Sequence, residues 1–298
     1  MKILYFSDGY AWHVMGTKRS IYEEVQKRGH EVIFLDKGLI WNISQYIFDY
    51  NPDQIWLVHT GLLFSKDDRK KIKVPIVGFG FSDPVYRVID YSHFDIYVTN
   101  HFETYKEVSK KMKCIYNPTA CDLRFHQKLK LPKTTDLLMI GTGIHARFKN
   151  KKMRIQYINN LRKDTTWIIN SYGKNWPKHP RNLGHIEGQE FLVAINSAKL
   201  GLDIQDEISP LAHRMFEFGA CGVPVITRHR PEVLIHLEKD KEVLTYQNYK
   251  DLLDQVNHYL INPSDLEQIG TRVLKRCVRD HNISNRVDHI LAELQRGQ

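Results

Sequence analysis

Short runs of β-branched and aromatic residues recur along this chain, and their spacing constrains its fold more than any other feature of the sequence. In the first part of the chain the runs are KILYFS, HEVIFLD, QIWLVHT, PIVGFGFS, FDIYVTN and KCIYNP. Polar or amphipathic stretches lie between several of them, which is the rhythm of β-α-β units. Because these runs are apolar along nearly their whole length, we expect a parallel sheet that is covered on both faces and wound with right-handed crossovers.

A second series of runs begins near residue 137. It consists of DLLMIGTG, TWIINSYG, GQEFLVAINSA, KLGLDIQD, VPVITRH and EVLTYQN, with a helix expected from about residue 149 to 163. A chain of 298 residues with 42% hydrophobic and 26% charged residues has enough apolar side chains for two ordinary cores. The sequence therefore predicts an α/β protein with two Rossmann-like domains.

The domain boundaries are predicted from composition and from the order of the elements. The polar, proline-containing stretch QKLKLPKTTD, residues 127–136, lies between the two series and has the character of a linker. This gives a first domain of residues 1–126 and a second domain of residues 137–280. Two final helices, the last of them within residues 281–298, have no strand after them, so we expect the chain to cross back onto the first domain.

The compartment is predicted from what the sequence lacks. Its apolar runs fall short of the roughly 20 residues of a membrane span, and the start MKILYFSDGY resembles a strand without a cleavage site. The cysteines form no C-x-x-C pair, so we expect buried, reduced thiols rather than a metal site or disulfides. These cysteines are Cys114, Cys121, Cys221 and Cys277. A cytoplasmic protein without bound metal is the prediction.

The positive charge of the chain is concentrated in one segment. Residues 141–181 hold ten Lys or Arg against a single acidic residue, Asp164, an excess as large as the net charge of +9 for the whole protein. The segment is open to three interpretations: a solvated helix face, a surface for a polyanion or an anionic membrane, or a site for a phosphorylated ligand. Trp167, Tyr172 and Trp176 lie within it, which keeps nucleic acid open as a partner, although no known nucleic-acid-binding motif is present.

The stretch ISPLAHRMFEFGACGVPVIT, residues 208–227, marks both ends of a helix. Ser209 followed by Pro210 is typical of a helix start, where a hydroxyl caps free amides and proline needs no N–H partner. Gly222 provides a left-handed residue after the last turn, and Pro224 prevents the helix from continuing. A helix bounded in this way leads directly into the buried strand VPVIT.

This helix follows the strand KLGLDIQD, so its start lies at the carboxyl edge of a parallel sheet, where open α/β sheets bind ligands. Its spacing places Arg214 and Glu217 together on a face away from the core. The amide end of the helix attracts phosphate, and a carboxylate further along accepts the two hydroxyls of a ribose. A nucleoside diphosphate would satisfy these features. The alternative is a surface ion pair of Arg214 and Glu217 worth about 0.3 kcal/mol.

The motif HRMFEFGACGVPVIT resembles the donor-site signature of group 1 nucleotide-sugar glycosyltransferases. Further segments are similar to the CgeB-like (spore maturation protein-like) branch of that group, namely YNPTACDLRFH, MIGTGIHAR, SYGKNWP, KLGLDIQ and RDHNISNRVDHIL. The resemblance implies a GT-B fold, in which two Rossmann-like domains face each other across a cleft, the second binding the donor and the first the acceptor. It also implies metal-independent transfer from a nucleotide-sugar, with a UDP-sugar as the expected donor, to a hydroxyl with retention of configuration.

Carried over by position, the resemblance assigns the donor ribose to Glu217 and the donor phosphates, or the orientation of Glu217, to Arg214. Arg147, with Lys151 or Lys152, would neutralise the leaving diphosphate. The full set of implied donor-binding residues is Gly141, Thr142, Gly143, Arg147, Lys152, Tyr172, Ser209, Pro210, Leu211, Ala212, Arg214 and Glu217. Many group 1 enzymes have a glutamate where this chain has Ser209. In this chain the nearby Asp206 or Glu207 could take its place. The identity of the sugar therefore stays open, as does an inactive member of the group.

The acceptor side is expected at the carboxyl ends of the strands in the first domain. His13, in the long loop after the first strand, could orient or deprotonate an acceptor hydroxyl, or be a stacked loop histidine. Asp83 and His101 are further catalytic candidates, with helix capping as the alternative for each. The predicted acceptor-binding residues are Gly9, Tyr10, His13, Gly16, Ser82 and Asp83.

Two other classes of function remain open from the sequence. The basic segment, residues 141–181, would suit a DNA-modifying glycosyltransferase or a nucleic-acid-binding protein. A noncatalytic structural protein that retains the fold is the second alternative. A glycan, a cell-wall polymer, a small molecule or DNA could serve as acceptor, and peripheral contact with an anionic membrane is compatible with the charge.

Overall fold

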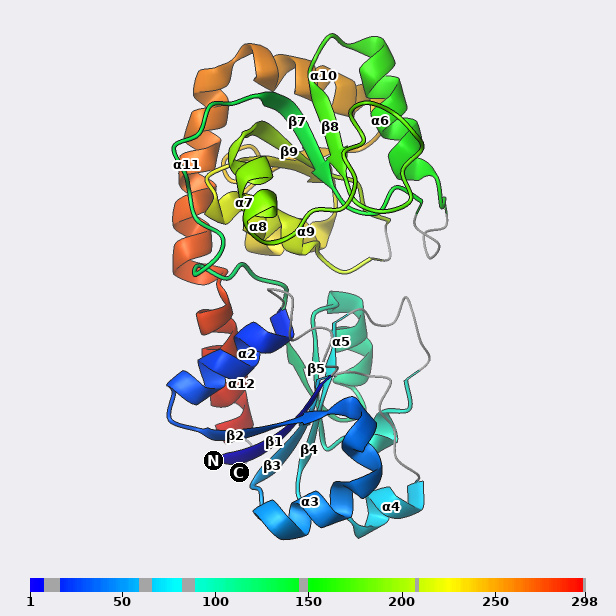
Figure 1. The fold of residues 1–298 in the computed structure, drawn as a ribbon, viewed down its shortest axis with the longest axis vertical. Helices are drawn as coiled ribbons and strands as arrows, with labels where there is room; N and C mark the ends of the chain where they lie inside the picture. Colours follow the sequence, from blue (N-terminus) through cyan, green and yellow to red (C-terminus); the bar gives the residue numbers. More distant parts are fainter. Residues whose placement is uncertain (8–16, 59–65, 82–88, 145–149, 207–208, 297–298) are drawn as a thin grey trace. The chain divides into compact units, whose positions relative to one another are not determined.

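The computed structural model describes residues 1–7, 17–58, 66–81, 89–144, 150–206 and 209–296. The chain divides into two compact units (Figure 1). Unit 1 consists of Met1–Pro118 and Ile283–Gln298, and unit 2 consists of Thr119–Asn282. Each unit is an open parallel sheet with helices on both faces, so the prediction of an α/β protein with two Rossmann-like domains is confirmed.

Unit 1 contains a six-stranded parallel sheet in the order β2-β1-β3-β4-β5-β6. Its strands are β1 (Lys2–Ser7), β2 (Glu31–Asp36), β3 (Gln54–Leu57), β4 (Ile76–Gly80), β5 (Ile96–Thr99) and β6 (Lys113–Tyr116). Each strand lies within one of the six apolar runs. All residues of β3 and β4 are buried, as expected of central strands in a sheet covered on both faces.

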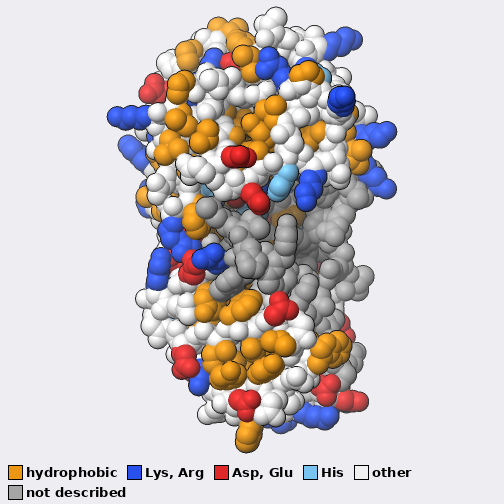
Figure 2. Space-filling view, in the orientation of Figure 1, with side chains coloured by type: hydrophobic (Ala, Val, Ile, Leu, Met, Phe, Trp, Pro, Cys, Tyr) orange, Lys and Arg blue, Asp and Glu red, His pale blue; other side chains and the backbone are white. Residues whose placement is uncertain are grey.

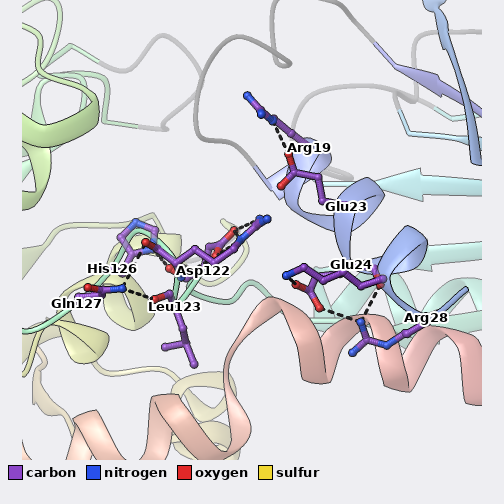
Figure 3. Close-up of polar contacts among 10 residues, drawn as sticks. Arg19, Glu23, Glu24, Arg28, Asp122, Leu123, His126 and Gln127 are labelled. Carbon is purple, nitrogen blue, oxygen red and sulfur yellow. Dashed lines mark hydrogen bonds and ion pairs between the residues drawn. The ribbon is translucent and has the colours of Figure 1, made fainter.

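The helices of unit 1 are short, apart from α2 and α12. They are α2 (Thr17–Lys27), the 3-10 helix η1 (Lys37–Asn42), α3 (Ile43–Tyr50), α4 (Lys66–Lys71), the 3-10 helix η2 (Tyr91–His93), α5 (Phe102–Val108) and α12 (Ile283–Gln295). Helix α12 packs against α2, as predicted for the end of the chain. Arg28, the first residue after α2, binds Glu24 of that helix (Figure 3), and it donates to Asp288 Oδ1 of α12 at 2.6 Å.

Unit 2 contains a five-stranded parallel sheet in the order β11-β10-β9-β7-β8. The strands are β7 (Thr135–Ile140), β8 (Ile169–Tyr172), β9 (Ala198–Asp203), β10 (Val225–Arg228) and β11 (Leu244–Tyr246). The helices are α6 (Met153–Asp164), α7 (Gly188–Asn196), α8 (His213–Ala220), α9 (Pro231–His236), α10 (Tyr249–Ile261) and α11 (Pro263–Asp280). The segment GQEFLVAINSA of the second series is therefore mostly helix α7.

The sheet of unit 2 separates two apolar cores. Successive residues of β7 alternate between them, because neighbouring side chains of a strand point to opposite faces. Leu138 and Ile140 join the core that contains residues of α8 and α11, whereas Leu137 and Met139 join the core of α6 and α10. This alternation accounts for the unbroken apolar runs that predicted the strands.

The boundary between the units lies at Pro118 and Thr119, before the predicted linker of residues 127–136. Residues of that stretch bind unit 2. The amide of Leu129 donates to Asn196 Oδ1 at 2.7 Å, and Lys133 Nζ donates to the carbonyls of Asn196 and Ala198 at 2.9 and 2.8 Å. Composition showed that the stretch is polar, but not that α7 supplies partners for it.

The cysteines agree with the prediction of unpaired thiols. Three of them, Cys121, Cys221 and Cys277, are buried, and Cys114 is half-buried; all four are free. Burial raises the pKa of Cys114 and of Cys221 to about 12, so neither is a reactive thiolate at neutral pH. Within the described part of the chain, the helices lack the length and hydrophobicity needed to cross a bilayer.

Candidate functional site

The carboxyl edge of the sheet in unit 2 has the topology of a ligand site. The chain passes from β7 to its neighbour β8, and then returns to place β9 on the other side of β7. The order therefore reverses between β7 and β9. In open α/β sheets, ligands bind in the crevice outside the carboxyl ends of the strands at such a reversal.

Helix α8 follows β9 at this edge, but it does not begin where the sequence predicted. Its first residue is His213, and Ala212 before it has an extended backbone with φ −72° and ψ 135°. The start at Ser209 and Pro210 was wrong, because contacts from distant residues hold the preceding chain in a non-helical path. Thr119 Oγ1 donates to the carbonyl of Leu211 at 3.3 Å, and Arg230 Nη1 donates to the carbonyl of Ser209.

The later start of α8 changes which backbone amides can meet a ligand. The Ser209 hydroxyl oxygen is buried and has no hydrogen-bond partner among the described residues, so it does not cap α8. The free amides of the first turn belong to residues from His213 onward instead. The far end of the helix agrees with the prediction, since Gly222 has φ +71° and its amide donates to Gly219.

Glu217 lies one turn along α8 from His213 in a nearly closed environment. Its side chain is 12% exposed, forms an ion pair with Arg214, and has Oε1 3.8 Å from His126 Nε2. Burial alone would raise the pKa of Glu217, but Arg214, His126 and His213 more than offset this and lower it below its ordinary value. The carboxylate is therefore ionised at neutral pH, and its burial disagrees with the alternative of a solvated surface pair.

Arg214 and His126 are themselves held in place. The guanidinium carbon of Arg214 lies 4.6 Å from the centre of the Phe191 ring, and the His126 ring meets the same phenylalanine edge-on at 6.0 Å. The amide of Asp122 donates to His126 Nδ1 at 3.1 Å, and Figure 3 shows the tight turn from Asp122 to Gln127 that produces this contact. The sequence prediction did not include His126 in the site. The one local signal was Asp122, a turn-forming residue four positions earlier, which indicates a tight turn at this place.

The turn after β7, residues 141–143, is closely packed against the loop after β8. The amides of Gly141 and Gly143 donate to the carbonyls of Tyr172 and Lys174, each at 2.9 Å. A Cβ atom on Gly143 would lie 2.7 Å from the carbonyl oxygen of Asn175, and one on Gly173 would lie 2.2 Å from that of Gly141. The glycines thus let two loops approach each other. Their predicted approach to a pyrophosphate stays a prediction.

Arg154 joins the two strands that flank the reversal of the sheet. It is 6% exposed, and it donates from Nε to the carbonyl of Ile204 after β9 at 2.9 Å and from Nη1 to the carbonyl of Thr142 after β7 at 3.0 Å. In the sequence, Arg154 was one of the ten cations of the basic segment and had no separate predicted role. Its position was detectable, because Arg154, Ile158 and Leu161 follow i, i+4, i+7 spacing and form the buried side of α6.

Comparison with known proteins places this site in a family context. Residues 154–292, just under half of the chain, match the family described as glycosyl transferase-like. The match includes α6 with Arg154, the whole of α8, and β10. It does not single out the CgeB-like branch, which stays a prediction. A search of curated proteins found no match to this sequence.

The fold of the chain is GT-B, as solved structures of similar topology show. Sucrose-phosphate synthase from Thermosynechococcus elongatus aligns with a TM-score of 0.75 and 13% identity over 100% of both chains. Anabaena HepE in complex with UDP and glucose aligns with a TM-score of 0.71 and 10% identity over 99% of both. The lipopolysaccharide outer core galactosyltransferase WaaB aligns with a TM-score of 0.66 and 11% identity over 100% of both.

The basic segment is less uniform than its sequence indicates. Arg154 is buried, and Arg162 is half-buried and donates to the carbonyls of Ile169 and Arg181, at 3.0 and 3.1 Å. Burial lowers the pKa of Arg162 to about 10. On the face drawn in Figure 2, the Lys and Arg side chains of the described residues are dispersed among uncharged ones. Part of the charge excess is therefore used inside unit 2, which weakens the basis for a nucleic-acid surface.

The remaining predicted site residues fall into two groups. Among described residues, Lys152 is exposed at the start of α6, Tyr172 is half-buried at the end of β8, and His101 is buried and caps α5 by accepting from the amide of Thr104 at 3.1 Å. His101 thus takes the structural role named as its alternative. The rest, Gly9, Tyr10, His13, Gly16, Ser82, Asp83, Arg147 and Glu207, lie outside the described residues.

Proposed function

We propose that this chain transfers a hexosyl group from a UDP-sugar to an acceptor hydroxyl, without a metal ion and with retention of configuration. The single observation that carries the proposal is Glu217. An ionised carboxylate, 12% exposed, lies one turn from the amide end of a helix at the reversal of a parallel sheet. Such a carboxylate can only accept hydrogen bonds, and its small opening suits a ligand with two adjacent hydroxyls.

The spacing along α8 suits a nucleoside diphosphate. Glu217 is four residues after His213, which corresponds to about 6 Å along the helix axis at 1.5 Å per residue. Ribose hydroxyls bound at Glu217 would leave the phosphates near the first turn, where free amides and the positive end of the helix favour negative charge. A ligand in this orientation follows the helix from carboxylate to amide end.

The choice of uracil as the base rests on similarity of fold. HepE, which shares the fold over nearly the whole chain, was solved with UDP, with UDP and glucose, and with UDP-glucose. Departing diphosphate charge can be stabilised by amides and cations that are already in place, so this chemistry has no intrinsic need for a metal ion. The family match of residues 154–292 supports sugar transfer as the reaction class.

Calorimetry with UDP, GDP and dTDP, followed by a screen of donor hydrolysis across UDP-sugars, tests the proposal without knowledge of the acceptor. The variant Glu217→Gln should lose most of its UDP affinity. Its amide has one acceptor oxygen and no charge, so it cannot accept hydrogen bonds from both ribose hydroxyls as the charged carboxylate can. The matched control is Glu267→Gln on the exposed part of α11, which removes the same charge from unit 2. Indifference of the wild-type protein to all three nucleotides would refute the proposed function.

A further inference from the structure

Four buried nitrogen and oxygen atoms near the start of α8 lack hydrogen-bond partners among the described residues. They are Ser209 Oγ, Arg214 Nε, Arg230 Nε and Arg230 Nη2. Buried polar groups in folded proteins are nearly always paired, and an unpaired one destabilises the fold, more so when it is charged. A concentration of unpaired donors at one place indicates a site that a ligand completes.

Arg230 is the most demanding member of this group. It is only 6% exposed, it follows the end of β10 by two residues, and Ser209 O is the acceptor of its one side-chain hydrogen bond to the described residues. A guanidinium group keeps its charge under all ordinary conditions. A buried and permanently charged group of this kind requires an anion or a strong acceptor nearby.

The two unpaired nitrogens identify the kind of anion. Nε and Nη2 form one edge of the planar guanidinium, with two parallel N–H bonds that point in the same direction. This edge is the fork that binds two oxygens of a phosphate or a carboxylate at once. The third nitrogen, Nη1, is already used to hold the carbonyl of Ser209, which fixes the orientation of the free edge.

The position of Arg230 indicates which part of the donor it meets. From Glu217, the helix α8 leads back to its first residue, His213, and the chain before the helix leads on to Ser209. Arg230 donates to the carbonyl of Ser209. In a nucleotide-sugar, the ribose, the diphosphate and the sugar follow one another in the same way. With the ribose at Glu217 and the diphosphate at the first turn of α8, a guanidinium held at Ser209 lies just beyond that turn, beside the distal phosphate that carries the sugar.

We propose that Arg230 binds the diphosphate of the donor through its Nε and Nη2 edge, an inference that rests on the proposed function. The hydroxyl of Ser209, buried and without a partner among the described residues, lies next to the same point and donates to the same group. Arg230, in the connection between β10 and α9, is then a second cation of the donor site, separate from the predicted Arg147.

The test compares UDP with uridine by isothermal titration calorimetry, using Arg230→Gln, Arg230→Lys and wild type. Loss of a fork of charge-assisted hydrogen bonds should weaken UDP binding roughly 10- to 100-fold in Arg230→Gln. Uridine binding should be unchanged, because uridine has no phosphate. The UDP affinity of Arg230→Lys, which keeps the charge but not the fork, should lie between those of wild type and Arg230→Gln. The control Arg272→Gln removes one exposed positive charge from α11 and should bind UDP like wild type.

Melting temperatures of the same variants separate this proposal from a purely structural role. If Arg230 pairs with a carboxylate of the chain itself, Arg230→Gln melts earlier without any change in UDP affinity, which overturns the proposal. An effect restricted to UDP-glucuronic acid and absent for UDP would also overturn it, because the anion would then belong to the sugar. If wild type binds UDP and Arg230→Gln binds it equally well, the inference fails while the proposed function stands. Failure of wild type to bind UDP removes both.

Discussion

Replacement of Arg154 by methionine should destabilise unit 2 by about 3 kcal/mol. The change removes hydrogen bonds of 2.9 and 3.0 Å to the carbonyls of Ile204 and Thr142, in a residue that is 6% exposed. Each hydrogen bond from a charged donor contributes about 1.5–3 kcal/mol to stability. Methionine has no charge to desolvate, and this gain offsets part of the loss of the two bonds. For a unit of this size, 1 kcal/mol corresponds to about 2–4 °C, so the melting temperature should fall by about 6–12 °C.

Differential scanning fluorimetry and circular dichroism measure this change, and UDP calorimetry at low temperature shows whether the donor site is affected as well. The control is Lys163→Met, which removes a positive charge from the exposed side of the same helix. A melting temperature of Arg154→Met equal to that of wild type would show that Arg154 does not join the ends of β7 and β9 as described.

Three further changes have definite expected outcomes. Burial lowers the pKa of His213 from its ordinary 6.5, so below that pH the unfolded chain binds more protons than the folded chain. The melting temperature of the wild type should therefore fall as the pH drops below 6.5. The fall should be shallower for His213→Gln, which cannot take up this proton. Gly173→Ala places a Cβ 2.2 Å from the carbonyl oxygen of Gly141 and should lower the melting temperature more than Gly184→Ala, where φ is also positive but the space is open; equal effects would contradict this. Arg28→Met removes the bonds from the residue after α2 to Ser284 and Asp288 of α12, so limited proteolysis should cut α12 faster than in wild type; an unchanged rate would argue against this attachment.

The strands were predictable because the signal is local and repeated. A buried parallel strand must be apolar on both faces, and runs such as KILYFS and FDIYVTN satisfy this without reference to the rest of the chain. The end of α8 was equally local, since Gly222 and Pro224 restrict the backbone directly. Right-handed crossovers restrict the face of the sheet on which each connecting helix lies, but they do not fix the order of the strands, which only the structure gives.

The start of α8 could not be predicted, because the local signal was real but was overridden. Ser209 and Pro210 suit a helix start, yet Thr119 and Arg230 bind the carbonyls of that segment from far away in the sequence. His126 was missed for the same reason, since it lies 91 positions before Glu217, the residue that it approaches. Contacts between distant segments leave no periodicity in the sequence.

Arg154 shows a different cause of error. The helical spacing of Arg154, Ile158 and Leu161 was visible, but Arg154 was counted only as one of the charges of the basic segment. A buried arginine is uncommon because its charge needs fixed acceptors. Two backbone carbonyls at the ends of neighbouring strands provide them here. Whether a charged residue on a helix is buried or exposed should therefore be predicted from the face on which it lies as well as from its residue type.

The return of α12 to unit 1 has a consequence for folding during synthesis. The first six strands leave the ribosome early, but the helix that covers Arg28 and packs on α2 is made only after all of unit 2. At 5–20 residues per second, that delay is roughly 10–30 s. Throughout this interval the surface later covered by Val287, Ile290 and Leu294 of α12 is open to water or to a chaperone. Unit 2, whose residues are contiguous, can complete its own fold before the unit that precedes it.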